Sequence, residues 1–93
     1  MARYETETSR PAHDILQQAE TFFGPDGVGL SARQRGGETG VWEGGGGVVA
    51  ITVTPLQRGS RVEVAATEWD REAEQFIKSM RGGFRLPFTS KSR

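Results

Sequence analysis

Apolar and polar positions alternate along several short stretches of the chain. Residues 48–54 instead form a run of β-branched and small side chains after four glycines, which predicts a central strand whose odd-numbered residues face inward. Residues 61–67 alternate after a turn at 57–60. The two strands are therefore expected to form an antiparallel hairpin.

Three shorter stretches predict further strands. Residues 3–8 alternate charged with neutral side chains, as suits an edge strand. Residues 39–43 form a short strand with Trp42 facing inward, because an exposed indole would forgo the largest burial that one side chain offers. Residues 28–33 predict a strand that turns three apolar side chains inward: Val28, Leu30 and Ala32.

Two stretches carry apolar residues at the three- and four-residue spacing of an amphipathic helix. The first covers residues 10–23, with Ser9 expected to cap it through its hydroxyl. The second covers residues 69–81, where Thr67 with Asp70 approximates a capping box. Its inward stripe is expected to contain Trp69, Ala73, Phe76, Ile77 and Met80.

The order strand, helix, four strands, helix predicts an α+β domain with a single five-stranded, mainly antiparallel sheet and two helices packed on one face. The domain is expected to span residues 1–83, followed by a flexible basic tail at 84–93. This order resembles the fold group of the TATA-box-binding-protein repeat and the Bet v 1 or START-like helix-grip proteins. The resemblance covers the topology of residues 3–81 and no family motif. It implies a curved sheet gripping the helix at 69–81 around a hydrophobic cavity.

The charge balance bears on the partner. Twelve basic and twelve acidic side chains cancel, so no net field attracts a polyanion. A sheet face that binds DNA needs an excess of basic or wedging aromatic side chains. Four arginines and four glutamates are expected to face outward, so their charges cancel and the sheet is not expected to bind nucleic acid. These residues are Arg3, Arg33, Arg35, Arg61, Glu5, Glu7, Glu43 and Glu63. Any binding of nucleic acid would then depend mainly on the basic tail.

No set of residues in the chain specifies a reaction. His13 is the single imidazole and no nucleophile is positioned for it, cysteine is absent, and no histidine pair has metal-ligand spacing. We therefore expect no catalytic residue, no metal site, no cofactor and no enzymatic activity. The glycine-rich stretches 24–29 and 44–47 are expected to be turns, because a phosphate-cradling loop leads from a strand into a helix. Residues 44–47 also suit a mobile lip over a groove.

The location follows from hydropathy. The longest apolar runs are too short to cross a bilayer. The first residues lack the apolar core of a signal peptide, so we expect a cytoplasmic protein.

The aromatic residues suggest a candidate site. One hypothesis is a groove between the sheet and the helix at 69–81 that holds an apolar small molecule or a partner segment. The alternative for the same rings is ordinary core, which a small chain needs for stability. The groove candidates are Phe23, Trp42, Trp69 and Phe76.

A second hypothesis assigns the binding to protein partners. The chain would be an interaction or self-association module, a monomer or a weak homodimer, acting through a strand edge or the tail. Phe84, Leu86 and Phe88 alternate with polar residues, as suits strand addition to a partner's sheet. Pro87 opposes a long strand there, so disorder is the alternative for the tail. The sequence thus predicts a non-catalytic binding module without identifying its ligand.

Overall fold

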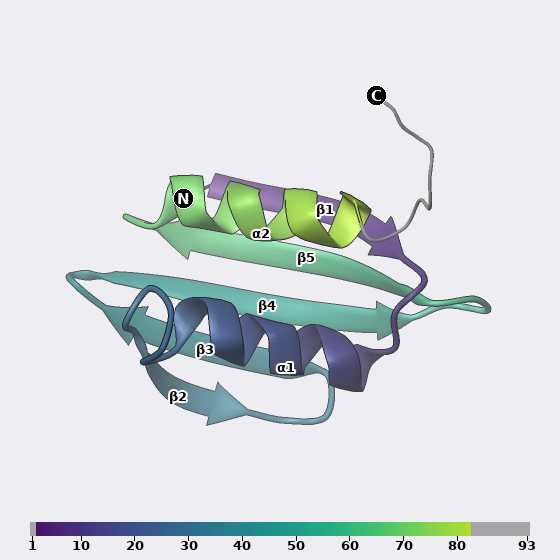
Figure 1. The fold of residues 1–93 in the computed structure, drawn as a ribbon, viewed down its shortest axis with the longest axis horizontal. Helices are drawn as coiled ribbons and strands as arrows, with labels where there is room; N and C mark the ends of the chain where they lie inside the picture. Colours follow the sequence, from purple (N-terminus) through teal and green to yellow (C-terminus); the bar gives the residue numbers. More distant parts are fainter. Residues whose placement is uncertain (1, 83–93) are drawn as a thin grey trace.

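The computed structural model describes residues 2–82, which form a five-stranded sheet with two helices on one face (Figure 1). The sheet has the strand order β1-β5-β4-β3-β2, and every neighbouring pair is antiparallel. This confirms the predicted α+β class and the order of elements. The elements are β1 (Ala2–Thr8), α1 (Ala12–Phe23), β2 (Ser31–Arg35), β3 (Thr39–Gly44), β4 (Gly47–Pro55), β5 (Ser60–Thr67) and α2 (Asp70–Gly82).

The core lies between the sheet and the helices. In Figure 1, α1 lies over β4 and β3, while α2 lies over β1 and β5. The strict alternation of β4 and β5 supplies the floor of this core, as predicted, because cross-strand partners share a face. The floor consists of three buried pairs: Val49 with Ala66, Ile51 with Val64, and Val53 with Val62.

The connection from β1 to α1 is held by buried hydroxyls and not by the predicted Ser9 cap. The residue before α1 is Pro11, and no side chain caps the first turn. Thr8 is buried, and its hydroxyl accepts a hydrogen bond from the Arg10 amide at 3.3 Å. The buried Ser60 hydroxyl donates to the Arg10 carbonyl at 2.9 Å. These bonds satisfy the backbone of the connection, so Ser9 stays exposed.

The predicted capping box before α2 is also absent. Thr67 is the last residue of β5, where it pairs with Val48, so it cannot cap a helix that begins at Asp70. Glu68 reverses the chain with a φ of 72°, a backbone conformation that residues other than glycine rarely adopt. The Ala73 amide then donates to the Trp69 carbonyl at 2.9 Å as the helix starts.

The strand β2 departs most from its prediction. Leu30 is buried, but it precedes the strand, in a segment whose amides bond to the carbonyls of Phe22 and Phe23. Ala32 lies opposite Trp42 yet is exposed, because α1 covers β3 and β4 and leaves β2 bare.

A register irregularity between Ala32 and Gln34 also changes which face β2 presents beyond this point. Arg35, predicted to face outward, instead lies opposite Gly40 on the helix side. It reaches the Glu20 carboxylate on α1 at 3.2 Å. The same Glu20 oxygen accepts a hydrogen bond from Trp42 Nε1 at 2.9 Å, so one carboxylate connects α1 to β2 and β3.

Candidate functional site

The sheet face opposite the helices is uncovered within the described residues, since both helices lie on the other face (Figure 1). At its centre, Val41, Ala50 and Ala65 are cross-strand partners in one row over β3, β4 and β5. Val48 lies beside this row on β4. All four are only partly exposed. We call this group the apolar strip.

The charged side chains of the open face lie around the apolar strip. Arg33 on β2 forms an ion pair with Glu43 on β3. Toward β1, Arg61 contacts Glu5 at 3.3 Å and Glu7 at 3.5 Å. These contacts are exposed, so each adds little to folding stability, about 1 kcal/mol or less.

Two further charges of this face, Arg3 and Glu63, form no ion pair among residues 2–82. Glu63 lies directly opposite Glu5 in the β1–β5 ladder. Like charges in directly opposite positions destabilise a sheet. With Arg35 on the other side, three arginines face four glutamates here, and the face has no basic excess that would attract nucleic acid.

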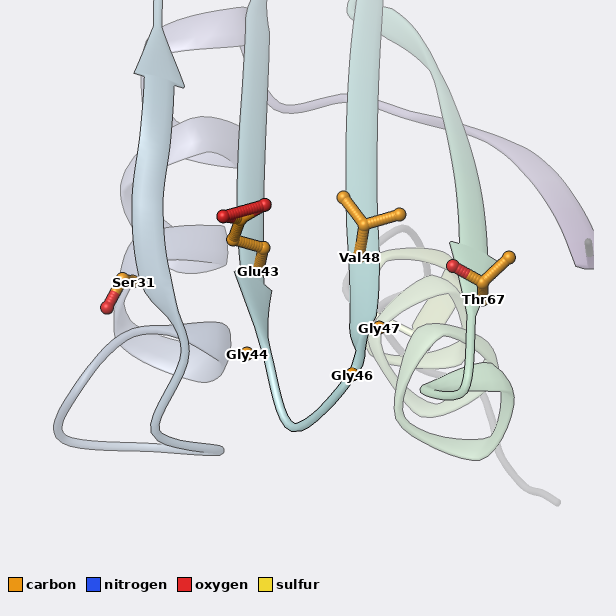
Figure 2. Close-up of a pocket in the computed structure, with 7 residues that line it drawn as sticks. All are labelled: Ser31, Glu43, Gly44, Gly46, Gly47, Val48 and Thr67. Atoms are coloured by element: carbon orange, nitrogen blue, oxygen red, sulfur yellow. The ribbon is translucent and has the colours of Figure 1, made fainter.

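A hollow of about 490 Å³ lies at one end of the open face, beside the β3–β4 turn (Figure 2). Figure 2 shows its side chains coming from four neighbouring strands, with the bare backbone of three glycines between them. The lining is as polar as it is apolar, which suits a polar group of a partner better than an apolar ligand. It consists of Ser31, Glu43, Gly44, Gly46, Gly47, Val48 and Thr67.

The four glycines form a tight turn that seats Trp69. Gly44 pairs with Gly47, and the two central residues, Gly45 and Gly46, have φ values of 59° and 83°, as a two-residue hairpin turn requires. The Trp69 ring would lie 2.7 Å from a Cβ atom at Gly45, and its Nε1 donates to the Gly44 carbonyl at 2.8 Å. The stretch is thus a turn, as predicted, and it binds the residue before α2. Three of these glycines also line the hollow beside the turn, and their role as a mobile lip stays a prediction.

Three of the four predicted groove residues lie in the core. Phe23, Trp42 and Phe76 are at most 1% exposed. The Phe23 ring centroid lies 6.1 Å from that of Trp42 and 5.4 Å from that of Phe76. Trp69 is partly buried against the same cluster. The rings therefore fill the space between sheet and helices, and the ligand groove stays a prediction that would require them to move apart.

A second hollow, of about 470 Å³, lies between the outer surfaces of α1 and α2. Its apolar part comes from Phe22 and Val28, which also pack against the core. The rest of the lining is uncharged apart from Glu72. This hollow is separate from the predicted groove, because none of the four groove residues lines it.

Phe84, Leu86 and Phe88 lie outside the described residues, as does the proposed tail from residue 84. His13 is exposed on α1. Within residues 2–82, no three histidine or carboxylate side chains gather as metal ligands would. No helix in that range has the length and hydropathy needed to span a bilayer.

Fold and surface together define a small α+β domain with one covered and one open sheet face. No family model, curated protein or solved structure matches the chain. The affiliation with helix-grip proteins therefore has no support beyond the order of elements. The open face was not recognised from the sequence, although apolar residues at even as well as odd positions of 48–53 were its signal.

Proposed function

We propose that this chain is a non-catalytic protein-interaction module whose binding surface is the open face of its sheet. The observation that carries the proposal is the apolar strip at the centre of an uncovered five-stranded face, with the charges around it. Protein interfaces have this arrangement, with a centre depleted of charge and a polar rim. An extended surface of this kind fits a macromolecule better than a small molecule.

The side chains of the strip support a protein partner in particular. Ala50 and Ala65 are small, so another backbone can approach the sheet closely. The hollow at the β3–β4 turn offers hydroxyl and carboxylate groups at the rim for directional hydrogen bonds. The net charge of the face does not favour nucleic acid. The cytoplasmic location stays a prediction from the sequence.

A site-specific photo-crosslinker tests the proposal in cells that make the chain. Thr52 is exposed on the open face, in the row next to the apolar strip. A crosslinker there should yield a covalent adduct with a protein, which mass spectrometry identifies. The matched control is Gln17, exposed on α1, which should yield none. Absence of any adduct at Thr52, or equal adducts at both positions, would contradict the proposal.

A further inference from the structure

We propose that the occupant of the open face is a second copy of this chain, stacked sheet against sheet about a two-fold axis that runs across the strands. This inference rests on the proposed function and adds the partner's identity. Such an axis places each strand over the same strand of the other copy, and the two strands run in opposite directions. The row that contains Ala50 then faces the row that contains Thr52.

The size of the face agrees with a dimer interface. Five strands spaced about 4.8 Å apart and about seven residues long give a surface of roughly 24 by 23 Å. Side chains stand above this plane, so the accessible area exceeds the flat extent of roughly 550 Å². It approaches the roughly 800 Å² that each partner buries in a standard interface. A stable dimer therefore needs most of the face, and no large part of it is blocked in residues 2–82.

The shape of the centre also suits stacking of two sheets. Sheets that pack face to face lie about 10 Å apart, and small side chains allow this approach. The apolar strip contains two alanines and two valines, and the row that would face Val41, Ala50 and Ala65 contains Thr39, Thr52 and Glu63. No aromatic side chain of the described chain points out of this face, so the two surfaces meet without a protruding ring.

The charges supply the strongest argument. Glu5 and Glu63 are adjacent acids in one row, and Arg3 lies in the neighbouring row opposite Ala65. The proposed axis exchanges these two rows, so each copy's Arg3 comes to lie over Glu5 of the other copy, with that copy's Glu63 beside it. The contact forms twice in the dimer, as a two-fold axis requires. It also brings an opposite charge close to Glu63, which forms no ion pair within residues 2–82 of its own chain.

The strand edges are less suited to self-association. The β2 edge is short, irregular and carries Arg33 and Arg35, and pairing with its own copy would bring arginines together. The other edge strand, β1, lies under α2 (Figure 1). If two copies paired through β1, the α2 helices of the two copies would collide. These features direct a second copy to the face.

Sedimentation equilibrium of the full chain tests the inference. The wild-type chain should show a concentration-dependent dimer. Ala50→Glu places an unpaired carboxylate in the apolar centre and should weaken association about 100-fold, equivalent to about 2.7 kcal/mol. Gln17→Glu, on exposed α1, is the matched control and should leave the dimer unchanged. Circular dichroism of each variant verifies folding, and Thr52→Arg replaces Ala50→Glu if that variant fails to fold.

A charge exchange tests the proposed axis itself. Arg3→Glu and Glu5→Arg should each weaken the dimer about 10-fold, because each places like charges face to face across the axis. The double variant restores opposite charges across the axis and should recover most of the loss. If the double variant loses as much dimerisation free energy as the two single variants together, the proposed axis is wrong.

The outcomes separate this inference from the proposed function. A wild-type chain that stays monomeric at millimolar concentration overturns the dimer. If the Thr52 crosslinker then captures a different protein, the interaction module stands and only the second copy is refuted. If Thr52 captures nothing, both proposals fail. A dimer that survives Ala50→Glu and Thr52→Arg assigns association to another surface and also refutes the inference.

Discussion

The two faces of the sheet are built from the same strands but differ in the polarity of their side chains and in what covers them. On the covered face, Trp42 and the β4 and β5 side chains meet rings from the helices, and Phe23 and Phe76 are almost completely buried. On the open face, the same strands present a partly exposed centre of alanine and valine together with threonine, arginine and glutamate side chains. Apolar side chains that meet the helices thus specify one face as core, while polar and charged side chains predominate on the face that residues 2–82 leave uncovered.

The largest expected effect comes from deleting a ring on the covered face. Phe76→Ala should lower the free energy of unfolding by about 3 to 5 kcal/mol, because the cavity cannot be filled by neighbours. Thr54→Ala on the open face is the matched control and should change it by less than about 0.5 kcal/mol. Urea unfolding followed by tryptophan fluorescence measures both. Similar losses for the two variants would remove the distinction between the faces.

The turn that seats Trp69 gives the next effect. Gly45→Ala combines a positive φ with a Cβ 2.7 Å from the Trp69 ring and should cost about 2 to 3 kcal/mol. Gly46→Ala has a positive φ but open space around its Cβ, so about 1 to 2 kcal/mol is expected. The Trp69 emission should shift only in the first variant. Equal losses of stability and equal emission spectra in the two variants would show that the position of the Trp69 ring does not depend on Gly45.

Glu20 tests how the covered face satisfies its buried indole. Glu20→Ala leaves the buried Trp42 N–H without its acceptor and should cost about 1 to 3 kcal/mol. Glu20→Gln keeps an acceptor oxygen and loses only the exposed ion pair with Arg35, so a cost below about 1 kcal/mol is expected. Thermal unfolding of the two variants compares the contribution of the hydrogen bond to Trp42 with that of the ion pair to Arg35. Equal losses in the two variants would show that the ion pair with Arg35, which both variants lose, matters more than the bond to Trp42.

The smallest effect concerns the edge of the covered face at high pH. Burial, and then the negative charges of Glu74 and Asp70, raise the pKa of Tyr4 above its usual value. The folded chain therefore keeps the phenol proton longer than the unfolded chain, so stability should fall as pH rises above about 10. Tyr4→Phe should reduce this alkaline loss. Because Tyr4 is the only tyrosine, its absorbance reports the titration directly, and ionisation at the usual pKa would contradict the expectation.

Much of the fold followed from local patterns. Strands at residues 3–8, 48–54 and 61–67 and both helices were predicted because burial at period two or at helical spacing leaves a mark in the sequence. The strand β2 was misplaced because its residues are all exposed and carry no such mark. The two predicted caps failed because Thr67 is held by its ladder to β4, and buried Thr8 and Ser60 satisfy the backbone near Ser9.

Local sequence patterns also predicted only part of the candidate site. Phe23, Trp42 and Phe76 were recognised as a cluster, but whether aromatic rings line a groove or fill it depends on the space between sheet and helices. The open face was missed, since Ala50 and Ala65 become a surface feature only when β4 and β5 align them.

The sequence by itself determined the α+β class, the order of elements and the inward set of the central strands, because each depends on residues close together in the chain. Only the tertiary structure decided three things: Trp69 rests on the glycine turn, Glu20 connects Trp42 with Arg35, and no part of residues 2–82 covers one sheet face. These depend on contacts between residues far apart in the chain. Their energies arise only when the helices pack on the sheet, and no local periodicity records them.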